Sequence, residues 1–87
     1  MTQKSGFTIL PVGGSFEMDY INLDGVLSRR IIDVRAFALD DDGYIQAFCH
    51  ERRAVRTFKY GGIVGLVDLE TGEVVKPEYF RRHLKAL

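Results

Sequence analysis

The chain has 87 residues, of which 46% are apolar and 28% charged, values that are ordinary for a folded domain and exclude a wholly disordered chain. A chain of this length can build one hydrophobic core, so a single domain is expected. Twelve basic and twelve acidic side chains cancel, and the total charge therefore points to no nucleic-acid, membrane or acidic partner.

Cysteine content and hydropathy indicate the compartment. Cys49 is the only cysteine, so no disulfide can form within the chain, and a reducing environment is expected. The first residues hold no long apolar core, so no secretory signal is expected, and no run approaches the ~18 apolar residues of a membrane span. We therefore expect a cytoplasmic protein without membrane association and without a cofactor.

The chain begins with an expected N-terminal arm or edge strand over residues 1–14. Its one apolar run is closed by Pro11, which cannot donate to a strand ladder and therefore favours an edge. Residues 15–22 alternate between apolar and polar side chains, and this period of two predicts a half-buried strand.

Two turn signals delimit the next strand. The Asp-Gly pair at 24–25 supplies the positive φ angles of a tight hairpin, and the acidic run 40–43 predicts a second turn. Between them, β-branched residues predict a long strand, in which Phe37 lies on the side opposite to Ile32 and Val34.

Three further strands are expected over 44–50, 55–60 and 63–69. A glycine pair at 61–62 lets the chain bend before the last of them, and a turn over 70–73 leads into two valines. The predicted core residues are Phe16, Met18, Tyr20, Ile32, Val34, Ile45, Ala47 and Val55.

Residues 77–87 are expected to form a short C-terminal helix, since Pro77 suits a first helical position. Its apolar stripe would consist of Phe80, Leu84 and Leu87. This stripe would dock on the sheet or on a partner, a homodimer included, because so short a helix is marginal alone. The predicted fold is mainly β: a small antiparallel β-barrel of about five strands over residues 15–76, followed by that helix.

Positive charge is concentrated in residues 44–60. Basic side chains exceed acidic ones by three there, whereas acidic ones exceed basic ones by three over residues 1–43. A neutral total can therefore hide a local positive field that attracts anions.

Aromatic and basic residues of this stretch fall on one predicted strand face. Side chains on one face repeat every second residue, about 6.6 Å apart. His50 and Arg52 would share a face with Tyr44, Gln46 and Phe48 if the strand ran straight.

The order of these residues resembles the WYL domain family of bacterial regulators. The similarity covers about residues 16–75, and its most specific part is Cys-His-x-Arg at 49–52 followed by Arg-Thr-Phe at 56–58. The preceding aromatic residue, turn glycine and basic residue of the family are matched by Tyr20, Gly25 and Arg29 or Arg30.

The chain departs from the family pattern at two positions. Gly43 stands where the family has its naming Trp, and Gly62 replaces an Arg that usually precedes the isoleucine after Arg-Thr-Phe. The chain also holds no winged helix-turn-helix, so a separate DNA-binding or effector protein is a further expected partner.

The resemblance implies an Sm-like, SH3-like barrel whose basic groove binds single-stranded nucleic acid or a nucleotide-like effector in transcriptional or anti-phage regulation. The implied ligand-binding residues are Tyr44, His50, Arg52, Arg56 and Lys59, with Gln46, Arg53, Arg29 and Arg30 as further candidates.

Other interpretations of these residues stay open. The cations can be solvated or paired with aspartates, and the domain can be an oligomerisation or adaptor module without a nucleic-acid ligand. Neighbouring strand residues point to opposite faces, so Cys49 and His50 do not form a nucleophile pair. One cysteine and two distant histidines fall short of a zinc site. We therefore expect neither an enzyme nor a metal site.

Overall fold

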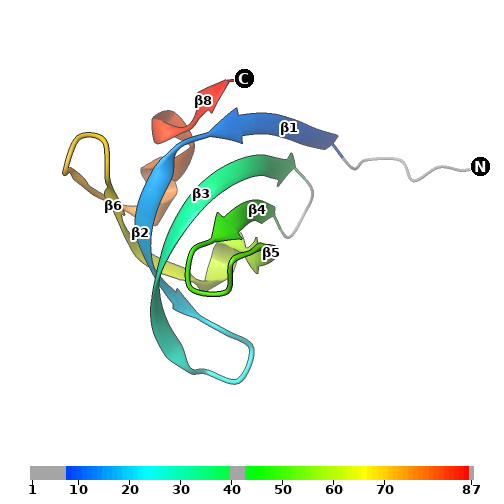
Figure 1. Cartoon of the computed structure of the whole chain (residues 1–87), viewed down its shortest axis with the longest axis vertical. Coiled ribbons are helices and arrows are strands. Elements are labelled where there is room, and N and C mark those ends of the chain that lie inside the picture. The colour runs from blue at the N-terminus through cyan, green and yellow to red at the C-terminus, as the bar shows by residue number, and fades with distance from the viewer. Residues whose placement is uncertain (1–7, 40–42, 87) are drawn as a thin grey trace, which may run out of the picture.

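The computed structural model describes residues 8–39 and 43–86, which form an antiparallel β-sheet with two short 3₁₀ segments (Figure 1). The elements are β1 (Thr8–Gly13), β2 (Ser15–Ile21), β3 (Leu27–Leu39), β4 (Tyr44–Cys49), β5 (Ala54–Lys59), η1 (Tyr60–Gly62), β6 (Ile63–Asp68), β7 (Val74–Val75), η2 (Pro77–His83) and β8 (Lys85–Ala86). Within the described residues, no helix is long and apolar enough to cross a membrane.

The strand order is β5-β4-β3-β2-β6-β7, and β1 pairs with both β3 and β8. The predicted mainly β, antiparallel architecture is therefore confirmed. The sheet has eight strands rather than about five, and β5 and β7 remain its two ends, so the described strands do not close into the predicted barrel.

Strands β1 and β2 follow each other along one edge of β3, with a kink at Gly14. β1 pairs with residues 36–39 of β3, and β2 pairs with residues 27–33. A Cβ atom at Gly14 would lie 2.9 Å from the Phe16 ring, and its φ of 141° is one that only glycine adopts readily. The predicted N-terminal strand is thus β1, while residues 1–7 lie outside the described part.

The hairpin between β2 and β3 projects from the rest of the fold (Figure 1). Gly25 has a φ of 79° and donates its N–H to the Asn22 carbonyl at 2.9 Å. The Asn22 side chain accepts N–H bonds from Asp24 and Val26 at 2.9 and 3.0 Å. The predicted turn at 24–25 is confirmed, whereas the predicted turn residues 40–42 lie outside the described residues.

A β-bulge between Val34 and Ala36 changes the alternation of β3. Ile32 and Val34 point into the core, and beyond the bulge Phe37 does so as well. The prediction that Phe37 lies on the opposite side is wrong, because a bulge opposes two residues to one and reverses the faces after it.

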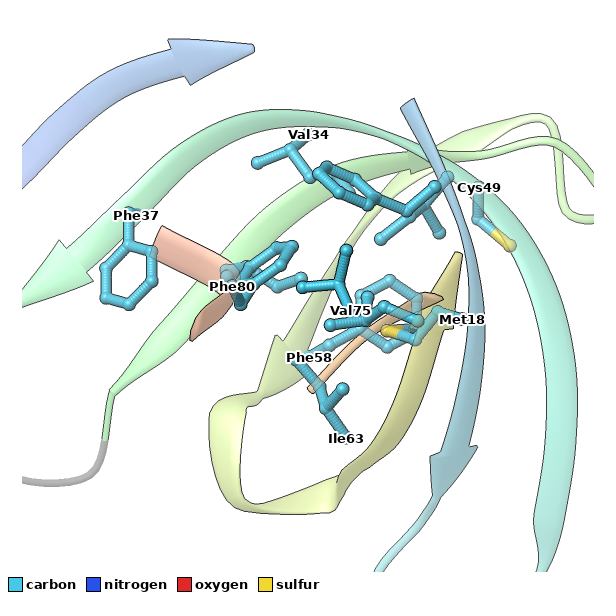
Figure 2. Packing of buried hydrophobic residues seen from close by; sticks show 13 residues of the cluster. Met18, Val34, Phe37, Cys49, Phe58, Ile63, Val75 and Phe80 are labelled. Carbon is cyan, nitrogen blue, oxygen red and sulfur yellow. The ribbon is translucent and has the colours of Figure 1, made fainter. Parts of the chain in front are cut away.

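Side chains from the strands and from η2 meet in one hydrophobic cluster (Figure 2). Of the predicted core, Phe16, Met18, Ile32, Val34, Ile45 and Ala47 are buried, and Tyr20 packs against the cluster. Val55 is 50% exposed, so its predicted core position is wrong. The β4–β5 register pairs Ile45 with Phe58, which puts Phe58 on the buried face in its place.

The C-terminal segment is a 3₁₀ helix, η2, followed by the two-residue strand β8. Phe80 is fully buried, 5.0 Å from the Phe16 ring, and Leu84 packs against the core. The Tyr60 hydroxyl donates to the Pro77 carbonyl. Phe80 and Leu84 of the expected apolar stripe therefore pack against the core of this chain. Leu87, the third residue of the stripe, lies outside the described residues.

Candidate functional site

Strand β4 ends at Cys49, before the last of the predicted site residues. A four-residue turn over 50–53 follows, and Arg53 has a φ of 54° within it. The condition under which His50 and Arg52 would share a face, a strand that runs straight through both, is therefore not met, because the turn redirects the chain between them.

A cleft of about 470 Å³ lies between β5 and the β2–β3 hairpin. It brings together four of the five principal predicted residues, together with one of the further candidates. Its lining consists of Tyr20, Asn22, Leu23, Asp24, Arg30, Tyr44, Arg52, Arg56, Thr57, Phe58 and Lys59. We call it the β5 cleft.

Arg30 is the most firmly held cation of the β5 cleft, with a side chain only 15% exposed. Its guanidinium lies 5.8 Å from the centre of the Phe58 ring, and its Nε donates to Ser28 at 3.1 Å. Its Nη1 lies 3.7 Å from the Cys49 sulfur and 3.9 Å from a Glu51 oxygen. Because packing and hydrogen bonds already orient this guanidinium, an anion there would meet a pre-positioned donor.

Arg29 does not belong to the cleft, although it neighbours Arg30 in sequence. It lies on the other face of β3, where its Nε donates to Asp19 at 2.8 Å. This ion pair lowers the pKa of the Asp19 carboxyl, chiefly through the hydrogen bond from Arg29.

The three outer cations of the cleft, Arg52, Arg56 and Lys59, make no ion pair with any carboxylate in residues 8–39 and 43–86. Both arginines are exposed, and Lys59 is partly buried. Pairing with aspartates, one of the alternatives for these cations, is therefore not found in the described part of the chain. Their donors face solvent and are open to an anionic ligand.

Tyr20 forms the far wall of the cleft. Its ring lies 5.1 Å from the Phe58 ring in an edge-to-face arrangement, and its hydroxyl accepts the Lys59 N–H at 3.0 Å. A Cβ atom at Gly62 would lie 2.7 Å from the Tyr20 ring and 2.6 Å from the Ile21 carbonyl oxygen. The absence of a side chain at Gly62 thus lets this tyrosine approach the backbone.

His50 lies away from the cleft, on the outer face of the sheet. Its Nε2 lies 2.8 Å from Asp33, which also accepts from the Ser15 hydroxyl at 2.7 Å. Partial burial opposes ionisation of Asp33, but these two hydrogen bonds lower its pKa below the ordinary value.

The other predicted residues outside the cleft are exposed. Gln46 lies on the outer face of β4, and Arg53 lies in the 50–53 turn. On the same outer face, Phe48 lies 5.6 Å from the His50 ring and 5.7 Å from the Arg35 guanidinium. The predicted site residues are therefore divided between two faces of the sheet.

Cys49 points to the face opposite His50, as expected from strand alternation, and is fully buried. Burial opposes ionisation of its thiol, but backbone N–H groups of the 50–53 turn and the Arg30 guanidinium lower its pKa. No group of three or more metal-ligating side chains occurs among the residues that the structure describes. Cys49 thus has a packing role beneath Arg30.

Six residues of the cleft were not predicted as ligand-binding positions: Tyr20, Asn22, Leu23, Asp24, Thr57 and Phe58. Phe58 belongs to the Arg-Thr-Phe segment, and Thr57 precedes it, so the resemblance itself contains the signal for both. Tyr20 was predicted as a core residue, and only the pairing of β2 with β6 brings it beside β5.

A comparison of the chain with protein-family models, with curated proteins and with solved structures finds no match.

Proposed function

We propose that this chain is a regulatory binding domain of the WYL type, without enzymatic activity, that takes an anionic, nucleotide-containing ligand or a single strand of nucleic acid in the β5 cleft. The proposal includes the bacterial role that the resemblance implies, control of transcription or of anti-phage systems, and it treats the open sheet as a form of the Sm-like barrel. The single observation that carries it is the gathering of Arg52, Arg56 and Lys59, which have no ion pair within residues 8–39 and 43–86, around Arg30 in one cleft.

The chemistry of the cleft supports a ligand with both phosphate and base. Guanidinium groups make paired, charge-assisted hydrogen bonds to phosphate oxygens. The partly buried rings of Tyr20 and Tyr44 line the same cleft, and a base stacked on an aromatic side chain contributes about 1 to 3 kcal/mol. Phosphate contacts alone do not favour a duplex over a single strand. Stacking on the cleft aromatics disfavours a duplex, because its bases are already stacked on one another.

A fluorescence titration tests this proposal with short single-stranded DNA, short RNA and cyclic nucleotides at two salt concentrations. Three phosphate contacts predict that log affinity for a single strand falls with log salt at a slope near −2.1, from about −0.7 per contact. Arg56→Gln should weaken binding about tenfold, because a hydrogen bond to a charged group is lost. Arg29→Gln, which removes the same charge on the other face, is the matched control. An affinity independent of salt would contradict the proposal.

A second candidate function is an oligomerisation or adaptor module, and exposed aliphatic side chains on the β2–β3 hairpin and on β6 favour it. They are Ile21, Leu23, Val26, Leu27 and Val64, with exposed fractions from 40% to 88%. Three of them, Ile21, Leu23 and Val64, line one hollow of the surface, and exposed apolar surface of this kind often marks a protein contact. Sedimentation would then detect a concentration-dependent dimer that Leu23→Asp dissociates, with no binding to oligonucleotides at low salt.

A further inference from the structure

Strand β5 presents a free backbone edge to the cleft. It pairs with β4 on one side and with no described strand on the other. The Tyr60 N–H donates toward β4, to Gly43 at 2.9 Å, whereas the Lys59 N–H donates away from β4, to the Tyr20 hydroxyl at 3.0 Å. Because these directions alternate along an antiparallel strand, Val55 and Thr57 direct their N–H and C=O groups to the free edge.

The side chains of β5 define what kind of strand would fit this edge. Arg56 shares the inward face with Phe58, near Arg30 and Arg52, and carries no ion pair in the described residues. On the outward face, Val55 is 50% exposed and Thr57 is also exposed. An added strand would therefore place acidic side chains beside Arg56 and β-branched ones beside Val55 and Thr57.

A second copy of this chain does not suit the edge. Pairing β5 with β5 would bring Arg52, Arg56 and Lys59 of two copies together, and like charges on neighbouring strands are destabilising. Such charges protect edge strands from self-association. They do not protect the edge from an acidic segment, which they attract.

We propose that the free edge of β5 binds, by antiparallel strand addition, an extended peptide segment of a partner protein in which acidic and β-branched residues alternate. The proposal rests on the proposed function in one respect: the segment occupies the same cleft as the nucleotide ligand, and so excludes it. Strand addition is a recurrent mode of peptide recognition, in which main-chain hydrogen bonds give affinity and alternate side chains give specificity. Within β5, Val55 and Thr57 would form the main-chain hydrogen bonds to the added segment. The Lys59 N–H would not, because it already donates to the Tyr20 hydroxyl.

The experiment uses the full chain and a short, end-blocked fluorescent peptide of alternating Glu and Val. Two singly N-methylated versions distinguish strand pairing from charge attraction alone. In antiparallel pairing, the valines of the peptide lie opposite Val55 and Thr57. Their N–H groups donate to the carbonyl oxygens of these two residues. A methyl group on a central Val nitrogen should therefore weaken binding at least tenfold. A methyl on a central Glu nitrogen points away from β5 and should change the affinity less than threefold.

Protein variants give the second arm of the test. Arg56→Gln should weaken the Glu-Val peptide about tenfold, and Arg29→Gln should leave it unchanged. Equal binding of the two methylated peptides would overturn the proposal, because it would leave charge attraction alone. So would the absence of any peptide binding at low salt.

Direct titrations keep this inference separate from the proposed function. Peptide binding without oligonucleotide binding would support strand addition while removing the nucleotide ligand. Oligonucleotide binding without peptide binding would support the nucleotide ligand and overturn strand addition. Where both bind, displacement of the peptide by a single-stranded oligonucleotide supports the shared cleft, and simultaneous binding contradicts it.

Discussion

At the scale of single residues, Gly62 explains how this chain departs from the family it resembles. The Tyr20 ring and the Ile21 carbonyl oxygen occupy the space that a side chain would need at this position. A Cβ atom there would lie 2.7 Å from the ring and 2.6 Å from the oxygen. Backbone and a packed ring cannot withdraw cheaply, so a larger residue here would force the wall of the cleft outward.

We therefore predict that Gly62→Arg, the change toward the family pattern, destabilises the fold by about 1 to 3 kcal/mol instead of adding a cation to the site. Urea unfolding measures the difference. Gly61→Arg is the matched control, because no atom lies within 4 Å of a Cβ there, and its unfolding free energy should stay close to that of the wild type. Equal stability of the two variants would contradict the close approach of Tyr20.

The neighbouring arginines 29 and 30 mark how far the candidate site could be predicted from the sequence. The concentration of positive charge in 44–60, together with the resemblance, pointed to four of the eleven residues that line the cleft: Tyr44, Arg52, Arg56 and Lys59. Sequence alone could not separate Arg30 from Arg29, because the choice depends on which face of β3 is covered. His50 was a predicted ligand residue because the resemblance implies it by position, and sequence alone does not show that the turn after Cys49 places it on the outer face.

At the scale of elements, the C-terminal segment is attached to the sheet by a buried polar pair. Nδ1 of His83 in η2 lies 3.0 Å from the Asp68 carboxylate at the end of β6, which also accepts the Glu70 N–H at 2.9 Å. Burial opposes ionisation of Asp68, but the hydrogen bonds from His83 and from the 69–73 turn lower its pKa from the ordinary 3.8. Lys85, which pairs with Glu70, adds positive charge nearby.

The lowered pKa of Asp68 predicts a specific loss of stability in acid. A carboxyl whose pKa is lower in the folded state stabilises the fold fully above its unfolded pKa, and loses this contribution as the pH falls through the folded pKa. Asp68→Asn should therefore destabilise the protein at pH 7 by about 1 to 3 kcal/mol and much less below pH ~3, as measured by urea unfolding at both pH values. Asp24→Asn, at the exposed hairpin tip, should change stability little at either pH. A loss that is the same at both pH values would show that the charge of Asp68 is not involved.

The elements themselves were predictable where a local signal exists. The alternation of residues 15–22 and the Asp-Gly pair determine β2 and its hairpin, because both signals act within a few residues. The bulge in β3 and the 3₁₀ form of η2 were not predictable, because each depends on what packs against it. Phe37 enters the core after the bulge, and Phe80 is inserted beside Phe16.

At the scale of the whole molecule, the fold is a strongly bent sheet whose ends do not pair. The β5 end approaches β2, and Tyr20 spans this gap through its edge contact with Phe58 and its hydroxyl bond to the Lys59 N–H. Strand β2 already pairs with β3 and with β6, so β5 forms no ladder with it in the described part of the chain. A single tyrosine supplies the contact instead, and the rest of the β5 edge stays accessible in the cleft.

This arrangement predicts that Tyr20→Phe lowers the unfolding free energy by about 0.5 to 1.5 kcal/mol, since the ring contact with Phe58 remains while the Lys59 N–H loses its acceptor. The variant also frees that N–H at the edge, so the Glu-Val peptide should bind at least as tightly as it does to the wild type. Tyr79→Phe is the control for stability, because Tyr79 is 43% exposed and no described residue pairs with its hydroxyl. If Tyr20→Phe were as stable as the wild type, the hydroxyl would not help to hold β5 against β2, and the aromatic contact with Phe58 alone would have to do so.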